Sequence, residues 1–139
     1  MRLPEENVAI GTPQGYEPSA EIIAASRQLA AASGATVVVT NDPVAAVDGA
    51  DAVYTDVWAS MGQESEADQR REIFAPYQVD EELMAHARPD ALFLHCLPAH
   101  RGEEVTSGVL DGPQSRVIPQ AANRMYFQMA LLEWLVCGS

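Results

Sequence analysis

Lysine is absent from this chain of 139 residues, which has eight arginines and a total of 20 aspartates and glutamates. The formal net charge at pH 7 is −12, and only Arg70 and Arg71 are adjacent, so no basic patch interrupts the acidic composition. A surface of this sign repels phosphate groups. We therefore expect neither nucleic acid nor an anionic membrane among the partners.

Cysteine is also scarce, and the sequence contains only Cys96 and Cys137. They lack the Cys-x-x-Cys or Cys/His spacing of a zinc site, so we expect no metal and a reduced, cytoplasmic setting. No apolar run approaches the roughly 18 residues of a membrane span. The opening segment Met-Arg-Leu-Pro-Glu-Glu-Asn lacks the apolar stretch of an export signal. We expect a protein that is neither embedded in a membrane nor exported.

The remaining composition is that of an ordinary folded protein. Apolar residues make up 47% of the chain and charged residues 20%, with a mean hydropathy of −0.08. The length suits one domain around one core.

Strands and helices are predicted to alternate along the chain. The uninterrupted run at residues 35–40 is typical of a strand covered on both faces, which favours a parallel sheet. We therefore predict an α/β fold, a Rossmann-like three-layer sandwich with a mostly parallel sheet. Strands are predicted at residues 8–12, 35–40, 52–56, 91–95 and 116–118. Helices are predicted from Pro18 to a stop at Gly34, from Asp42 and Pro43 through residue 50, and over residues 64–74, 80–87, 103–110 and 121–136.

The last predicted helix, residues 121–136, has an unusual pattern. Its apolar side chains cover more than one face, and they are Met125, Phe127, Met129, Leu131, Leu132, Trp134, Leu135 and Val136. A helix that is apolar nearly all round needs partners on both sides. One small domain does not obviously provide them.

The tetrapeptide His95-Cys96-Leu97-Pro98 places a thiol where a predicted strand gives way to a loop. Open α/β sheets bind their ligands at this end of their strands. A thiol there is small and can lose a proton near neutral pH. The residues alone favour the other interpretation, a buried, inert Cys96 that packs as a small hydrophobe. His95 has the pattern of a hydrogen-bonded core histidine.

Asp56 stands at the end of the strand predicted at residues 52–56. A carboxylate there can hold a substrate ammonium by a charge-assisted hydrogen bond, although a helix cap or loop-closing role fits as well. Ser60, Met61 and Gly62 follow, and they suit either a closing loop or a plain surface loop. Arg124, near the start of the last helix, could bind an anion or simply face solvent.

The order of three segments is more specific than any one of them. Asp-Val-Trp-Ala-Ser-Met-Gly-Gln-Glu (56–64), Phe-Leu-His-Cys-Leu-Pro-Ala-His-Arg-Gly (93–102) and Gln-Ala-Ala-Asn-Arg-Met (120–125) together resemble ornithine carbamoyltransferases. The resemblance runs from about Asn7 to the last helix and includes Thr-Pro-Gln-Gly-Tyr-Glu-Pro at residues 12–18.

This resemblance implies transfer of the carbamoyl group from carbamoyl phosphate to the side-chain amine of L-ornithine, which gives citrulline and phosphate. It implies that Asp56, Ser60 and Met61 bind the amino-acid end of ornithine. Cys96 and the Leu97 backbone would face the amine and carbamoyl phosphate, and Arg124 would hold the carbamoyl group or phosphate. No metal or organic cofactor is implied.

The resemblance also implies that this chain is partial. The family's preceding domain carries a Ser-Thr-Arg-Thr phosphate cradle, and its second domain opens with a Gly-Asp-Gly-Asn-Asn strand; neither string occurs here. We therefore expect residues 1–139 to form most of an ornithine-binding domain without its first strand. The helix at 121–136 would pack on the missing N-terminal domain, and the intact family forms trimers.

Two local differences set this chain apart from the family pattern. Ala122 stands where the family has glutamate, and Tyr126 where it has histidine. We therefore expect the neighbourhood of Arg124 to differ from that of the family.

The alternative hypothesis is a non-catalytic amino-acid-binding or regulatory domain derived from a carbamoyltransferase, which kept the amino-acid site and lost the donor site.

Overall fold

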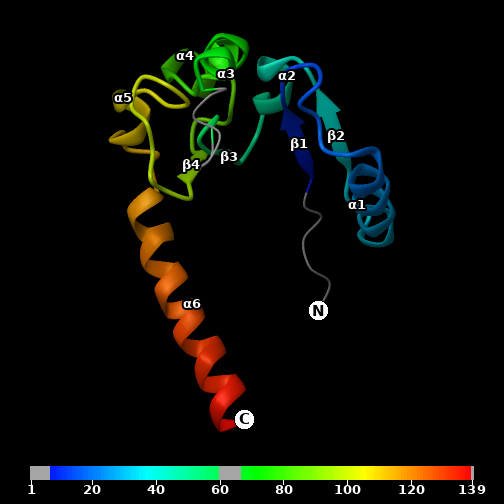
Figure 1. Cartoon of the computed structure of the whole chain (residues 1–139), viewed down its shortest axis with the longest axis vertical. Coiled ribbons are helices and arrows are strands. Elements are labelled where there is room, and N and C mark those ends of the chain that lie inside the picture. The colour runs from blue at the N-terminus through cyan, green and yellow to red at the C-terminus, as the bar shows by residue number, and fades with distance from the viewer. Residues whose placement is uncertain (1–6, 60–66, 139) are drawn as a thin grey trace.

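A computed structural model describes residues 7–59 and 67–138 and shows a mixed α/β chain (Figure 1). The strands are β1 (Val8–Gly11), β2 (Val37–Thr40), β3 (Ala52–Thr55) and β4 (Leu92–His95). The helices are α1 (Ala20–Ser33), α2 (Pro43–Val47), α3 (Ala67–Phe74), α4 (Glu81–Met84), α5 (Ser107–Leu110) and α6 (Val117–Cys137), and η2 (Ala75–Tyr77) is a 3-10 turn.

The strands pair in parallel, as predicted, but in two small sheets. β1 pairs with β2 from Val8↔Val37 onward, and β3 pairs with β4 from Ala52↔Leu92 to Thr55↔His95. Within the described residues β1 and β3 do not pair, and Figure 1 shows the two strand pairs standing apart. The expected continuous sheet is therefore interrupted between β1 and β3.

Contacts outside the sheets connect the two strand pairs. α2 packs on β1 and also touches α4. Two backbone bonds join the end of α2 to the segment after α4, with Gly49 N–H donating to the His86 carbonyl at 3.0 Å and Arg88 N–H to the Ala50 carbonyl at 3.1 Å. The Tyr16 and Phe74 rings meet edge to face, 4.9 Å between centroids. A cavity of 310 Å³ remains between the pairs, reaching from Gly11 to the end of β3.

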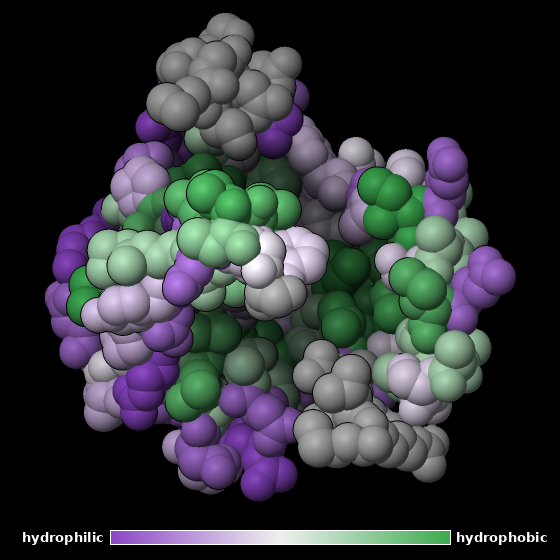
Figure 2. Space-filling view, turned by 90° about the horizontal axis from the view of Figure 1, so that it is seen from below, coloured by the Kyte–Doolittle hydropathy of each residue, from purple (hydrophilic) through white to green (hydrophobic). Residues whose placement is uncertain are grey.

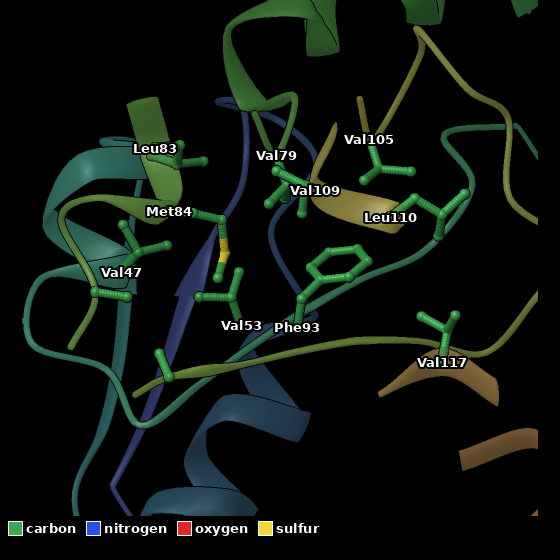
Figure 3. Close-up of a cluster of buried hydrophobic side chains, with 12 residues drawn as sticks. Val47, Val53, Val79, Leu83, Met84, Phe93, Val105, Val109, Leu110 and Val117 are labelled. Carbon is green, nitrogen blue, oxygen red and sulfur yellow. The ribbon is translucent and has the colours of Figure 1, made fainter. Parts of the chain in front are cut away.

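The hydrophobic core lies almost entirely around β3 and β4 (Figure 3). Phe93 is 0% exposed at its centre. Side chains from α2, α4, α5 and the start of α6 surround it, together with Val53 of β3 and the loop residues Val79 and Val105.

The β1–α1–β2 part contributes little to this core. Val38 of β2 is 51% exposed, which contradicts the expectation of a strand covered on both faces. On α1, which lies against β2, Ile22 is 59% and Leu29 76% exposed. The predicted apolar side of this helix therefore has little to pack against among the described residues.

Caps confirm the predicted end of α1 and the predicted start of α2. Gly34 ends α1 with a positive φ, and Asp42 Oδ1 accepts from Val44 N–H at 2.9 Å at the start of α2, where Pro43 is the first helical residue. Pro18 is not helical, because the Ser19 hydroxyl caps α1 by accepting from Ile22 N–H at 3.3 Å.

α2 ends at Val47 rather than at residue 50, and α4 covers only Glu81–Met84 of the helix expected at 80–87. Of the helix expected at 64–74, residues 64–66 lie outside the described residues, and α3 covers the rest.

Two other predictions were wrong. The strand expected at 116–118 is reduced to an isolated bridge between Ser115 and Phe93, because α6 begins at Val117, earlier than predicted. Pro119 lies in the first turn of α6, where a missing N–H costs no bond. The helix expected at 103–110 is shortened to α5, because Val105 pairs with Val79 and Thr106 caps the helix.

α6 extends away from the rest of the molecule (Figure 1). Of its residues only Val117 is buried, and large apolar side chains from Met125 to Val136 are exposed. Figure 2, seen from the α6 end, shows apolar surface on this face. Among the described residues, no helix is long and apolar enough to cross a membrane.

The uneven core predicts unequal effects of two truncations. Phe93→Ala should lower the free energy of unfolding by about 3–5 kcal/mol, because it leaves a cavity in the packed core. Val38→Ala should lower it by less than about 1 kcal/mol, because half of that side chain already faces solvent. Urea unfolding followed by circular dichroism measures both, and equal losses would contradict a core centred on β3 and β4.

The exposed apolar surface of α6 predicts self-association of this chain. We expect sedimentation velocity at tens of micromolar to show species larger than the monomer. Leu132→Glu with Leu135→Glu should shift the distribution toward monomer, whereas Leu29→Glu on the equally exposed α1 should change it little. A monodisperse wild-type monomer would rule out this expectation.

Candidate active site

The parallel register of β3 and β4 brings Asp56 and Cys96 together. The last paired residues are Thr55 and His95, so the next residue on each strand lies opposite the other. Adjacent strands are about 4.8 Å apart, within reach of two short side chains. The Cys96 thiol donates a hydrogen bond to Asp56 Oδ1 at 3.0 Å, and the same oxygen accepts from Val57 N–H at 2.7 Å.

The surroundings of Cys96 keep its thiol protonated. Burial raises the pKa of Cys96, and the hydrogen bond to Asp56 and the charge of that carboxylate raise the pKa further. The neighbouring Tyr54 side chain lowers the pKa of Cys96 and so acts in the opposite direction. At neutral pH the sulfur is therefore a hydrogen-bond donor.

Cys96 is not part of the packed core. It is partly exposed and lines a groove of 790 Å³. Leu97, Pro98 and the α6 residues Arg124 and Met125 also line this groove. The full burial expected of an inert core cysteine is therefore not found at Cys96.

His95 is the buried, hydrogen-bonded histidine that its pattern predicted. Its side chain and that of Glu104 are both 0% exposed, and His95 Nε2 lies 3.1 Å from Glu104 Oε1. Because His95 Nδ1 accepts from Leu97 N–H at 2.8 Å, the ring proton belongs on Nε2, where it is donated to Glu104.

The ring of His95 also supports the backbone next to the thiol. Leu97 has a φ of 56°, a left-handed conformation that costs a non-glycine residue of order 1–3 kcal/mol. Glu104 Oε1 accepts from His100 N–H at 2.6 Å as well, so it joins both ends of the loop after β4. The strained turn at Leu97 is thus held from inside the protein.

Arg124 reaches the same place from α6. Its Nη1 donates to the Cys96 carbonyl at 3.2 Å, which sets a positive charge beside the thiol and the Leu97 backbone. The structure thus brings together four predicted site residues, Asp56, Cys96, Leu97 and Arg124. Ser60 and Met61 were also predicted, and they lie outside the described residues.

Three further side chains at this site were not predicted. Tyr54 lies near Cys96 and Gln120, both of which influence the pKa of its hydroxyl. Gln120 Oε1 accepts from His95 N–H at 3.0 Å, and Glu104 Oε1 accepts from His95 Nε2 at 3.1 Å. Tyr54 could have been found, because residues two apart on a strand share a face and Tyr54 precedes Asp56 by two. Gln120 and Glu104 could not have been found in this way. Their positions at the site depend on where α6 begins and on the path of a loop, and neither leaves a periodic pattern in the sequence.

Two groups of side chains in the described residues could offer metal ligands. They are Asp56, His95 and Cys96, and His100, Glu103 and Glu104, each with donor atoms within 4.8 Å of one another. In the first group all three side chains already hydrogen-bond with protein atoms. In the second, Glu103 Oε1 pairs with Arg71 Nε at 3.1 Å. The expectation that no metal binds here stays a prediction.

The parallel strands, the thiol–carboxylate pair at their carboxyl ends and the arginine on the following helix define an α/β domain with a candidate site at the ends of its strands. The chain belongs to the aspartate/ornithine carbamoyltransferase family, whose Asp/Orn-binding domain it matches over residues 3–135.

Two similar proteins are named ornithine carbamoyltransferase. The chain is 59% identical to the ornithine carbamoyltransferase of Geobacillus stearothermophilus over 91% of this chain and 40% of that protein. It is 58% identical to that of Anoxybacillus flavithermus over 89% of this chain and 40% of the relative. The chain thus spans about two fifths of the length of these relatives.

Solved structures agree with these sequences and with the predicted fold class. The ornithine carbamoyltransferase of Pyrococcus furiosus superposes with a TM-score of 0.89 at 53% identity, covering 96% of this chain and 42% of that one. The anabolic enzyme of Campylobacter jejuni superposes with a TM-score of 0.86 at 36% identity, covering 93% and 43%. The described chain therefore has the Rossmann-like fold of these neighbours.

The hydrogen-bonded pair of Cys96 and Asp56 predicts how the pKa of Cys96 changes when the negative charge of Asp56 is removed. In a Cys137→Ser background, Asp56→Asn should lower the pKa of Cys96 toward its ordinary value, because the negative charge that disfavours the thiolate is gone. The alkylation rate at pH 8 should rise, about tenfold for a fall of one in the pKa.

Asp51→Asn is the matched control for this measurement. Asp51 lies just before β3, where it pairs with Arg88 at 3.1 Å. That change should leave the alkylation rate of Cys96 as it was, and an equal response to both substitutions would contradict the role given to Asp56.

Proposed function

We propose that this chain is the ornithine-binding part of an ornithine carbamoyltransferase. The observation that carries the proposal is the Asp56–Cys96 pair, 3.0 Å apart at the carboxyl ends of two adjacent parallel strands, with Arg124 bonded to the Cys96 backbone. The names of the relatives support the same reaction class. The reaction makes citrulline, a precursor in arginine biosynthesis.

Asp56, with Ser60 and Met61, is proposed to hold the amino-acid end of L-ornithine. A free ammonium beside the Asp56 carboxylate gains a charge-assisted hydrogen bond, which is stronger in a partly enclosed site. The two other residues follow Asp56 closely in sequence, so they are available to the same end of the substrate.

Cys96 and Leu97 are proposed to face the reacting amine and carbamoyl phosphate. An amine with a pKa of about 10.4 must become neutral before it attacks, at a cost of about 4.6 kcal/mol at pH 7. Removal of the ammonium from water in a closed site lowers its pKa and therefore reduces this cost. Because the raised pKa of Cys96 keeps its thiol protonated, the thiol orients the amine, and a phosphate oxygen is the better proton acceptor.

The proposed chemistry is acyl transfer. The amine lone pair forms an N–C bond to the carbamoyl carbon, and a tetrahedral intermediate results. The C–O bond to phosphate then breaks, the amine loses one proton, and inorganic phosphate leaves. Arg124 is proposed to hold the carbamoyl or phosphate oxygens, for which its planar guanidinium offers paired donors. No step requires a metal or an organic cofactor.

The rest of the site is proposed to come from a further N-terminal domain that binds carbamoyl phosphate. Two features of the described residues favour a covering partner: the exposed apolar surface of α6, and the unpaired edges of β1 and β3, between which one further parallel strand would continue the sheet. Assembly of the whole protein into a homo-oligomer, a trimer as in the intact family, is part of this proposal.

Calorimetry and a citrulline assay test the proposal on the chain as it stands. We expect L-ornithine to bind, Asp56→Ala to weaken binding at least tenfold by loss of its ammonium partner, and Asp51→Ala to leave binding unchanged. With saturating ornithine and carbamoyl phosphate, we expect no citrulline above background, because the phosphate cradle is absent from these residues.

The same measurements separate the two hypotheses for the chain. Binding of carbamoyl phosphate that is lost in Arg124→Ala supports part of an enzyme. Binding of ornithine alone supports a non-catalytic amino-acid-binding module. Absence of ornithine binding, or turnover by this chain alone, would contradict the proposal.

A further inference from the structure

Arg70 on α3 contacts both halves of the described chain. Its Nη1 donates a hydrogen bond to the Trp58 carbonyl at 3.2 Å, and Trp58 follows β3. Its guanidinium carbon lies 5.3 Å from the centre of the Tyr16 ring, and Tyr16 follows β1. Because β1 and β3 do not pair within the described residues, this side chain spans the interruption between the two strand pairs.

The ring of Phe74 makes a related set of contacts from the same face of α3. Arg70 and Phe74 are four residues apart on the helix, so their side chains are neighbours. The Phe74 ring meets Tyr16 at 4.9 Å between centroids and lies 6.2 Å from the Trp58 ring. The Tyr16 backbone is held in turn, since the Thr12 hydroxyl donates to its carbonyl at 3.1 Å. Arg70 therefore reaches Trp58 from a fixed position.

Trp58 stands two residues after Asp56, the proposed partner of the substrate ammonium. The strand register places Asp56 beside Cys96, but the β3–β4 ladder ends just before them, and the direction of the carboxylate depends on the backbone that follows. Asp56 Oδ1 accepts from Val57 N–H at 2.7 Å, which ties the carboxylate to that backbone. The bond from Arg70 fixes the same backbone one residue further on, at the Trp58 carbonyl.

An arginine suits this position better than a lysine. A planar guanidinium can lie over an aromatic ring while one of its N–H groups donates to a carbonyl, whereas an ammonium is a point charge without a plane. Arg70 makes both kinds of contact at once. The adjacent Arg71 instead pairs with Asp68 at 2.6 Å and with Glu103 at 3.1 Å. The two neighbouring arginines therefore have different contacts.

We propose that Arg70 is a positioning residue for ornithine binding, which holds the backbone after β3 so that the Asp56 carboxylate keeps its place beside Cys96. Arg70 acts through Asp56 and does not touch the substrate. Its contact with Tyr16 makes the half around β1 part of the support of the site. This inference rests on the proposed function, because the ammonium-binding task of Asp56 is part of that function.

Alkylation of Cys96 by iodoacetamide across pH tests this role without any substrate, in a Cys137→Ser background. Burial raises the pKa of Cys96, and so do the hydrogen bond and the charge of Asp56. If the carboxylate moves away, the titration midpoint falls. Arg70→Met should therefore lower the midpoint, and a fall of half a pH unit raises the rate at pH 8 about threefold. Loss of a positive charge by itself would raise the midpoint instead.

A double variant shows whether Arg70 acts through Asp56. In an Asp56→Asn background, Arg70→Met should produce no further fall of the midpoint, because no carboxylate remains to be misplaced. Arg71→Met is the matched control, since it makes the same change at the next residue of α3, and it should leave the midpoint as it was. If Arg70→Met does not fold, Arg70→Lys keeps the charge and a donor, and its midpoint should lie between those of the wild type and Asp56→Asn.

Calorimetry with L-ornithine measures the consequence for binding. Arg70→Met should weaken binding at least about fivefold, because a charge-assisted hydrogen bond depends on its geometry. Arg71→Met should leave binding unchanged. L-Ornithine carries two ammonium groups and one carboxylate, so removal of a positive charge by itself would strengthen its binding.

An unchanged or raised midpoint in Arg70→Met, or a further fall in the Asp56→Asn background, would overturn the proposal. A merely structural role would lower the melting temperature without moving the midpoint of the folded protein. Weaker ornithine binding with an unchanged midpoint would place Arg70 in contact with the substrate, which also overturns it. If the midpoint falls as expected but the wild-type chain binds no ornithine, the proposed function fails while the support of Asp56 by Arg70 stands.

Discussion

The parallel register of β3 and β4 is the constraint on which the rest of the site depends. Phe93 anchors β4 in the core, and Val53 opposite it anchors β3. With this pair fixed, a step of one residue is forbidden, because it would turn every side chain to the other face of the sheet. Asp56 and Cys96 therefore meet without any contact of their own having to bring them together. Their hydrogen bond is a result of core packing several residues away.

The two halves of the described chain are organised differently. The half around β3 and β4 has a continuous core, capped helices and a buried His95–Glu104 pair. The half around β1, β2 and α1 has correct strand pairing and caps but few buried side chains. Local signals are enough to form strands and helices there, whereas burial requires a neighbour on each face. The site is built on the half that has its own core.

The sequence predicted the parts of this structure that depend on local chemistry. Gly34, Asp42 and Pro43 mark helix ends because their backbone and side-chain preferences act within a few residues. Parallel pairing followed from alternation of strands and helices, and with it the meeting of strand ends near Asp56 and Cys96. These predictions do not require knowing how the helices and strands pack against one another.

The other features of the structure depend on packing between residues far apart in the sequence, which residue spacing does not predict. Glu104 lies in a loop, and only the path of that loop brings its carboxylate to His95. The early start of α6 decides both the loss of a strand at 116–118 and the role of Gln120. Exposure of Val38 was missed for a different reason: a β-branched run indicates a strand that is suited to burial, but whether it is buried depends on the neighbours of that strand.

The bond between Cys96 and Asp56 has a consequence for the chemical durability of the site. Oxidants attack cysteine through its thiolate, and each step toward sulfenic and sulfinic acid begins from that form. We expect a sulfur that is held as a donor, beside a carboxylate that opposes loss of its proton, to react slowly with peroxide even though it is partly exposed in a groove. The geometry that aims the thiol thus also protects it, so a protein with an open groove can keep a reduced cysteine at its centre.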